Sequence, residues 1–281
     1  MNNHPPNSSA SSNTSYRNGE TVASDIATDR ALLYGDGVFT TIAIKDQKAL
    51  LIEEHFERLV NNCQQLKINN LPLNEIKVSL SSAIENIHQG IARITVTRSS
   101  GERGYLCANP NPVFWITISQ WPAHIELFRT AGIKVRYCEQ RLSQNPSLAG
   151  IKHCNRLEQV LARNEWQSDD YQEGLMLDTE GHLIEGTMSN LFLIKNNQLI
   201  TPKLALSGVK GIMRQRVIEM AESEGIEVII TEVRPENLTT ADAAFVTNSV
   251  IGIWSINQIE NYTFTKSPLI EQLQQSLYKL I

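Results

Sequence analysis

Lys152 follows an apolar stretch, which is an unusual sequence context for a lysine that is exposed to solvent. The residues before it, 148–151, are mostly apolar, and those after it are expected to begin an amphipathic helix. Burial disfavours a charged ammonium, so a lysine in this setting loses its proton more easily than a solvated one. A neutral amine is what Schiff-base chemistry requires. For a lysine considered alone, a packed stem with a solvated head group is the better interpretation.

Glu185 is a second unusual residue, a carboxylate at the end of a predicted strand. Residues 182–185 precede another apolar segment at residues 190–194. A carboxylate between apolar strands is costly unless a positive group meets it. The protonated nitrogen of a pyridine ring would be a suitable partner, and the carboxylate would make that ring a stronger electron sink. A strand-end glutamate in water is the simpler alternative when Glu185 is considered alone.

A glycine-containing turn at residues 207–211 leads directly into a predicted helix. Gly208 and Gly211 allow the backbone to approach a bound group closely. The free N–H groups and the dipole of a helix start attract anions such as phosphate. The third glycine of a dinucleotide-binding motif is absent, so that class of site is not indicated. An ordinary helix start that binds only water is the alternative.

Two further segments carry side chains suited to phosphate. Thr247, Asn248 and Ser249 follow a predicted strand and offer hydroxyl and amide donors. Arg58, on a predicted helix, has the geometry for paired hydrogen bonds to phosphate oxygens. The alternatives are an ordinary polar turn and a surface ion pair between Arg58 and Glu54.

Composition indicates a globular protein that acts on neither nucleic acid nor membranes. The chain has 281 residues, 41% of them hydrophobic, which is enough for one large domain or two modest ones. The formal net charge is −5 and the Lys and Arg residues are scattered, so we expect no nucleic-acid partner. No apolar run approaches the length of a bilayer span, so we expect no membrane association.

The cysteines and the N-terminal segment indicate the compartment. Cys63, Cys107, Cys138 and Cys154 lie far apart without metal-ligand spacing. We therefore expect no metal site, reduced thiols and a cytoplasmic location. The first fifteen residues are rich in Asn, Ser and Pro and lack the apolar core of a signal peptide. We interpret residues 1–20 as a disordered or atypical extension.

The predicted elements form two clusters. The first is a hairpin, two helices and two strands, at residues 38–52, 53–66, 72–87, 92–98 and 113–119. The second has helices at residues 155–166 and 209–224, and strands at residues 133–138, 174–178, 182–185, 190–194, 198–200, 227–232, 243–247 and 251–256. Clustered strands without regular β–α alternation indicate an α+β fold. We expect an N-terminal α+β domain at residues 21–123, a linker at residues 124–131 and a second domain at residues 132–281.

Several short motifs occur in a characteristic order. The most specific is LAGIKHCNRLEQVL, which contains Lys152. It is accompanied by DRA at residues 29–31, YGDGVFTT at residues 34–41, RGY at residues 103–105 and GIMRQ at residues 211–215. Together these motifs resemble the fold-type IV, branched-chain-aminotransferase-like pyridoxal-phosphate enzymes. The resemblance implies a small N-terminal α/β sandwich, a larger, strand-rich and barrel-like C-terminal domain that binds pyridoxal 5′-phosphate, and a homodimer.

The resemblance also implies a role for each residue of the site. Lys152 would bind the cofactor covalently and Glu185 would face its pyridine nitrogen. The phosphate would be held by Arg58, the backbone amides of Ile212 and Met213, and the turn of Thr247, Asn248 and Ser249.

Within this group the chain is most similar to the lyases that convert 4-amino-4-deoxychorismate to 4-aminobenzoate and pyruvate in folate biosynthesis. Related transaminases usually have an aromatic residue and a glutamate where this chain has Phe39 and Thr40, and an aromatic residue near Arg156. A branched-chain or D-amino-acid aminotransferase is the alternative. A binding or regulatory protein that keeps the scaffold without chemistry is a third possibility, against which Lys152 and Glu185 together argue.

The substrate contacts are left open by the resemblance. Thr40, Thr41 and Arg103 are candidates for protonating the leaving group, and we group Thr40 with the catalytic residues. Arg98, Arg103 and Arg141 are candidates for binding the two carboxylates of the substrate.

Overall fold

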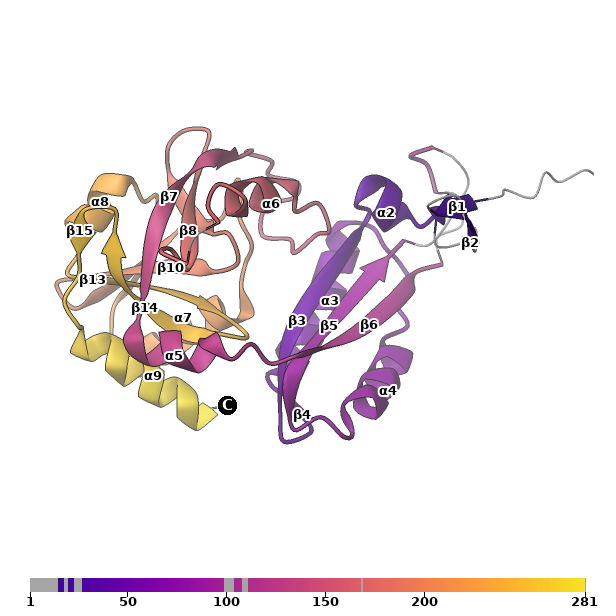
Figure 1. The fold of residues 1–281 in the computed structure, drawn as a ribbon, viewed down its shortest axis with the longest axis horizontal. Coiled ribbons are helices and arrows are strands. Elements are labelled where there is room, and N and C mark those ends of the chain that lie inside the picture. Colours follow the sequence, from indigo (N-terminus) through magenta and orange to yellow (C-terminus); the bar gives the residue numbers. More distant parts are fainter. Residues whose placement is uncertain are drawn as a thin grey trace, which may run out of the picture.

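The computed structural model describes residues 15–17, 20–22, 27–98, 104–107, 111–167 and 169–280. Figure 1 shows two lobes side by side, a small sheet with helices formed by the first part of the chain and a larger strand-rich lobe formed by the rest. The described N-terminal residues include a short antiparallel pair, β1 (Ser15–Arg17) and β2 (Glu20–Val22), and helix α2 (Arg30–Tyr34). Arg103 and most of the predicted N-terminal extension lie outside the described residues.

The N-terminal lobe is an antiparallel sheet covered on one face by two helices. The sheet has the order β4 (Lys48–Ala49), β3 (Gly37–Lys45), β5 (Gln89–Thr97) and β6 (Val113–Gln120). The helices are α3 (Ile52–Gln65) and α4 (Leu73–Ile84). Alternate side chains of a strand point to opposite faces of the sheet, and Val38 and Ile42 of β3 pack against Leu59 of α3 in one buried cluster. The other face of β3 is therefore left for Phe39 and Thr41.

Six strands of the second lobe close into a barrel. Their order is β10 (Asn190–Lys195), β13 (Ala243–Asn248), β14 (Gly252–Ile259), β7 (Ile133–Leu142), β8 (Glu173–Asp178) and β9 (Leu183–Gly186), and β9 pairs back with β10. Strands β11 (Gln198–Pro202), β12 (Val228–Thr231) and β15 (Tyr262–Thr263) extend the same sheet. Closure pairs the strands that would otherwise be edges and encloses a core that includes Leu191, Val246 and Trp254. The expected α+β fold with a barrel-like second domain is confirmed.

Helices pack around this barrel. They are α5 (His124–Ala131), α6 (Leu157–Arg163), α7 (Ile212–Ser223), α8 (Pro235–Thr239) and α9 (Pro268–Leu280). Residues 124–131, for which we expected a linker, form helix α5, and its Ile125 belongs to the buried core of the barrel. The connection between the lobes is correspondingly short, because β6 ends at Gln120. The division into two domains stays a proposal.

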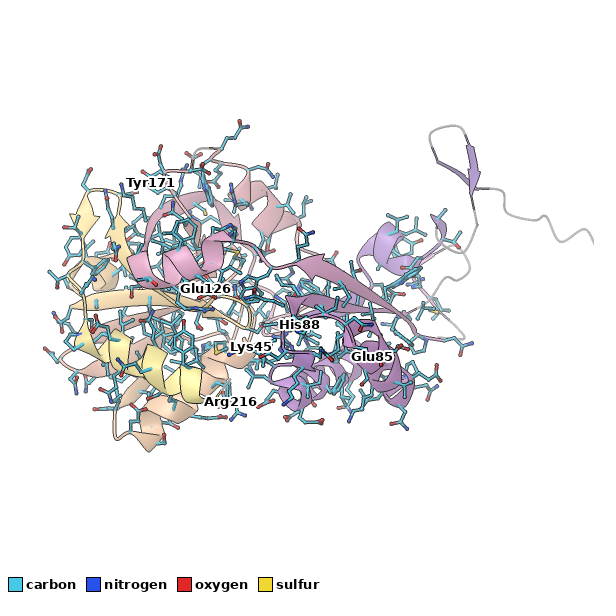
Figure 2. The ribbon with its side chains drawn as sticks, turned by 60° about the horizontal axis from the view of Figure 1, so that its bottom comes forward. Lys45, Glu85, His88, Glu126, Tyr171 and Arg216 are labelled. Carbon is cyan, nitrogen blue, oxygen red and sulfur yellow. The ribbon has the colours of Figure 1, made fainter. Side chains whose placement is uncertain are left out.

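The two lobes are joined by main-chain and side-chain contacts next to Lys152. Phe39 N donates to Lys152 O at 2.9 Å, and Cys154 N donates to Gly37 O at 2.8 Å. Farther along the junction, Arg216 of α7 pairs with Glu54 of α3, and Figure 2 shows Arg216 on the side of the barrel lobe that borders the N-terminal lobe. These contacts fix strand β3 against the segment that carries Lys152.

The predicted strands and helices of both lobes are present, with small shifts at their ends. The C-terminal helix α9, the helix α5 and the short β1, β2, α2, α8 and β15 had no counterpart among the predicted elements. In the part of the chain that the structure describes, no helix is long and apolar enough to cross a membrane.

Candidate active site

A cavity of about 590 Å³ lies between the lobes. Lys152 and Glu185 both line it, together with Phe39 and Thr41 from β3 and Arg58 from α3. The volume is in the usual range for a site that encloses a small ligand. Residues predicted from separate motifs are thus brought to one place by the docking of the N-terminal sheet onto the open end of the barrel.

Lys152 reaches this cavity from the loop before α6. Its Nζ lies 4.6 Å from the centroid of the Phe39 ring. Burial lowers the pKa of the Lys152 amine, the nearby Arg58 lowers it further, and Glu185 acts in the opposite direction. The site therefore holds more of the amine in the neutral form, which nucleophilic attack on an aldehyde requires, than a solvated lysine would.

Glu185 is buried at the end of β9, on the barrel side of the cavity. Its Oε2 accepts hydrogen bonds from Val209 N at 2.8 Å and from Asn190 Nδ2 at 3.5 Å. Burial raises the pKa of this carboxyl, whereas the Val209 hydrogen bond and the charges of Arg156 and Lys152 lower it. A buried carboxylate of this kind is stabilised by a positive group placed against it.

Arg58 forms the cationic end of the cavity. Its Nη2 donates to Thr40 Oγ1 at 2.5 Å, while its Nε is buried without a hydrogen-bond partner among the described residues. Burial lowers the pKa of Arg58 to about 10, which still leaves the guanidinium charged at neutral pH. A buried cation with a spare donor suits an anionic group such as phosphate.

The start of α7 lies beside Arg58 and adds backbone donors. Gly211, Ile212 and Met213 line the cavity, and Gly211 caps the helix without a side-chain hydrogen bond. The first amides of a helix have no partner within it, so they are available to an anion. Gly211 is required here because a Cβ at this position would lie 2.0 Å from Asn190 Oδ1.

The turn after β13 supplies part of the cavity wall. Asn248 and Ser249 line the cavity, and Ser249 Oγ donates to Thr41 O at 2.7 Å. Asn248 uses its side chain within the turn and on Met188 O. The hydroxyl of the buried Thr247 donates to Gly252 O at 2.6 Å, so its side chain braces the turn.

Thr40 and Thr41, neighbours on β3, lie on opposite faces of the sheet. Thr41 lines the cavity. Thr40 is fully buried on the helix-covered face, where its Oγ1 also contacts His55 Nδ1 at 2.6 Å. Burial lowers the pKa of His55 to about 3, so the ring is neutral and its Nδ1 can accept a hydrogen bond from the Thr40 hydroxyl. Thr40 therefore contacts Arg58 from the helix-covered face and does not line the cavity in which it was predicted to protonate the leaving group.

The arginines predicted to bind substrate lie elsewhere. Arg98 pairs with Asp36 at 2.9 Å and donates to Lys67 O and Leu66 O, so its guanidinium stabilises the N-terminal lobe. Arg141 donates to Cys138 O and does not line the cavity. Arg103 falls outside the described part of the chain.

The structure brings three further residues to the site that the sequence motifs did not single out as site residues. Phe39 packs beneath Lys152, Asn190 contacts Glu185, and Arg156 lines the cavity. The alternation of β3 places Phe39 on the same face as Thr41, which is a signal available in the sequence. The contact between Asn190 and Glu185 depends on the β9–β10 register, which the sequence alone does not specify.

The arrangement fits pyridoxal phosphate. Lys152 offers a primary amine and Glu185 an opposing carboxylate, while the unpartnered Nε of Arg58 and the uncapped start of α7 offer donors at the phosphate end. Among the described residues, no cluster of His, Cys, Asp and Glu side chains could hold a metal ion.

The amino-acid sequence matches one protein family and several known relatives. Residues 37–259 match the family model described as amino-transferase class IV. The aminodeoxychorismate lyase of Vibrio harveyi is 35% identical over 82% of this chain and 86% of its own length. A putative branched-chain-amino-acid aminotransferase of Methanocaldococcus jannaschii is 34% identical over 83% of this chain and 81% of its own length.

A solved structure is similar over almost the whole chain. The 4-amino-4-deoxychorismate lyase of Pseudomonas aeruginosa has a TM-score of 0.87 and 37% sequence identity, covering 93% of this chain and 97% of that protein. The match of the family model over most of the chain and the sequence identity of these relatives lead to one conclusion. The chain belongs to the amino-transferase class IV family.

Proposed function

We propose that this protein is a pyridoxal-phosphate-dependent lyase that converts 4-amino-4-deoxychorismate to 4-aminobenzoate and pyruvate, a step of folate biosynthesis. The observation that carries the proposal is the pairing of Lys152 with Glu185 in one cavity of a chain that is 35% and 37% identical to two such lyases. The class IV family is one of pyridoxal-phosphate enzymes.

The residues around the cavity would hold the cofactor at both of its ends. Lys152 would bind its aldehyde, and Glu185 would keep a proton on its ring nitrogen. Its phosphate would bind Arg58 and the amides of Ile212 and Met213, beside the turn of Thr247, Asn248 and Ser249, whose side-chain donors brace the cavity wall. When bound, pyridoxal phosphate supplies an electron-accepting ring next to the substrate amine.

Lys152 is the proposed general base. Displaced by the substrate amine, it would remove the proton from the amine-bearing carbon of the substrate. The lowered pKa of Lys152 increases the fraction of the amine that is unprotonated, the form that this step uses. Loss of the enolpyruvyl group then makes the substrate ring aromatic, and Thr41, on the cavity side of β3, is the proposed proton donor to that group.

Cationic side chains near the cavity would bind the two carboxylates of the substrate. Arg156 and Arg163 both line the cavity. Arg93 does not line the cavity, but its Cζ lies 3.8 Å from the centroid of the Phe39 ring, which does, and its charge lowers the pKa of Lys152. Arg156 and Arg163, which line the cavity, take the place of Arg98 and Arg141, which do not.

We also propose that the enzyme is a cytoplasmic homodimer that acts on a small molecule. The thiols of Cys63, Cys107, Cys138 and Cys154 are free, which is typical of a reducing compartment. Apolar side chains exposed on α6, those of Leu157, Val160 and Leu161, support a second copy as the partner.

The test is a direct assay of the purified protein loaded with pyridoxal phosphate. With 4-amino-4-deoxychorismate as the single substrate, pyruvate and 4-aminobenzoate should form in equal amounts over many turnovers. A lyase regains its starting state in each cycle, so no 2-oxoacid is needed. Product formation that stops after one equivalent unless a 2-oxoacid is supplied would contradict the proposal.

That result would favour the second candidate, an amino-acid aminotransferase. The observation in its favour is the 34% identity to the putative branched-chain-amino-acid aminotransferase. An aminotransferase returns the proton to the cofactor and needs a second substrate. Incubation with branched-chain amino acids and 2-oxoglutarate should therefore give little glutamate if the lyase proposal is right.

A further inference from the structure

Glu173, at the start of β8, is a second buried carboxylate close to the site. Only 1% of its surface is exposed, and no ion pair of Glu173 is found among the described residues. A buried carboxylate without a counter-ion is costly unless hydrogen bonds compensate it. The source of that compensation is the turn at residues 186–189, which connects β9 to β10.

Five donors converge on the Glu173 carboxylate. Oε1 accepts from Thr187 N at 3.0 Å, from Thr187 Oγ1 at 2.5 Å and from Gly174 N at 2.9 Å. Oε2 accepts from Met188 N at 3.2 Å and from Ser189 Oγ at 2.7 Å. Four of these donors belong to the turn, so one side chain engages the donors of three successive turn residues.

This turn connects the two residues that form the barrel side of the site. Glu185 precedes it and Asn190 follows it, and the two are paired across β9 and β10. All four residues of the turn line the cavity. Because Gly186 N also donates to Ser189 O at 2.7 Å, the turn is closed at its base and anchored at its tip.

Gly186 allows the carboxylate to approach this closely. A Cβ at Gly186 would lie 2.7 Å from Glu173 Oε2 and 2.3 Å from Ser189 Oγ. Both distances are too short for a carbon atom next to oxygen. The position of the Glu173 carboxylate therefore depends on a glycine at residue 186.

We propose that Glu173 is a positioning residue, a fixed internal anion that gathers the donors of the turn at residues 186–189 and thereby holds Glu185 in place against the cavity. The amides of Thr187 and Met188 and the hydroxyls of Thr187 and Ser189 are used within the protein, so these groups are not available to the carboxylates of the substrate. The inference rests on the proposed function only in assigning Glu185 its contact with the cofactor.

The test removes the carboxylate and returns it as a small anion. Glu173→Ala leaves a space lined by converging donors, which formate fits by charge and size. We expect kcat of the variant to fall about tenfold or more, because displaced catalytic groups lose rate steeply. Formate should restore a large part of kcat in a saturable way, while formamide, which has the same shape without the charge, should not.

A second measurement uses the cofactor-free protein and does not depend on the reaction. Formate should raise the unfolding temperature of the cofactor-free Glu173→Ala protein and leave that of the wild type unchanged. Glu75→Ala, which removes an exposed carboxylate from α4, is the matched control and should show neither the loss nor the rescue. If the lyase assay fails while formate still stabilises Glu173→Ala, the proposed function is wrong and the role of Glu173 stands.

The proposal is overturned if Glu173→Ala keeps full kcat, or if formamide rescues as well as formate. Should the alanine variant not fold, hydrogen exchange of the wild type tests the same arrangement. The amide of Met188, which donates to the Glu173 carboxylate, should then exchange as slowly as those of β9, although it lies in a turn. The amide of Thr187 also donates to Gly174 O and is not used as the readout. Rapid exchange of the Met188 amide would show that the carboxylate does not hold it.

Discussion

At the scale of single residues, the site depends on two buried groups of opposite charge. Burial lowers the pKa of Lys152 and raises that of Glu185, so desolvation opposes the charged form of each. Their mutual attraction acts against that effect. These shifts suit the proposed roles, a nucleophilic amine for Lys152 and a contact with a positive ring nitrogen for Glu185.

Lys152 should be the residue that binds the cofactor. Reduction of the loaded protein with borohydride, followed by peptide mapping, should place the label on Lys152. Because its pKa lies below the usual lysine value of about 10.4, capture of pyridoxal phosphate by the cofactor-free protein should reach half its maximal rate well below that pH. A label on another lysine would show that Lys152 is not the residue that binds the cofactor.

Glu185→Gln should retain the cofactor but turn over slowly. A neutral amide stabilises a protonated pyridine poorly, and loss of one such contact in a buried site costs about 2–4 kcal/mol. That corresponds to a rate reduced by roughly 30-fold to 1,000-fold. Steady-state assays with cofactor content measured in parallel would check this. Full activity of the variant would mean that Glu185 has no contact with the ring nitrogen.

At the scale of elements, helix α3 and strand β3 together orient Arg58. Thr40 on β3 accepts a hydrogen bond from Arg58 and contacts His55, which lies one helical turn before Arg58 on α3. His55 is fully buried and its Nε2 has no partner among the described residues. The contacts among Thr40, His55 and Arg58 join β3 to α3 and hold the Arg58 guanidinium at the proposed phosphate site.

Thr40→Val should therefore weaken cofactor binding more than it changes the chemical step. A hydrogen bond to a charged group contributes about 1.5–3 kcal/mol to the protein that contains it, which sets an upper limit of roughly a hundredfold on the loss of pyridoxal-phosphate affinity when Arg58 is no longer oriented. Thr40→Ser keeps the hydroxyl and is the matched control. Equilibrium titration of the cofactor-free variants measures the difference. If saturating cofactor leaves Thr40→Val without turnover while affinity is unchanged, Thr40 acts in the reaction itself.

At the scale of the whole molecule, exposed apolar side chains point to a second copy. Leu157 of α6 is 69% exposed, and Leu32 of α2 is 70% exposed. Large apolar patches on a soluble protein mark interaction surfaces, and twofold pairing is the commonest form of self-association.

Light scattering should give a mass twice that of one chain. Leu161→Glu, on the exposed side of α6, should shift the protein towards the monomer and lower activity at the same time. Val78→Glu, a substitution at another exposed apolar side chain on α4, should leave the mass unchanged. An active monomer at assay concentration would exclude the homodimer as the functional form.

Much of the fold is readable from local patterns. Alternating and helical periodicities predicted β3, α3 and the strands of the second lobe, because burial of one face imposes those periods. Lys152 and Glu185 stand out as charged groups within apolar sequence, but it was the order of the motifs and the family resemblance that gave them roles in a site. The glycine turn before Ile212 predicted the helix start that lines the cavity.

Long-range packing decided the rest. Thr40 and Thr41 are equivalent in sequence, but α3 covers one face of β3 and the barrel lobe meets the other, which separates their environments. Arg98 was predicted to bind substrate, yet Asp36 and two carbonyls that are distant in sequence engage it. Residues 124–131 form a helix because Ile125 packs into the barrel core. Local sequence specifies periodicity and charge, whereas the partner of each side chain depends on which distant segments the fold brings against it.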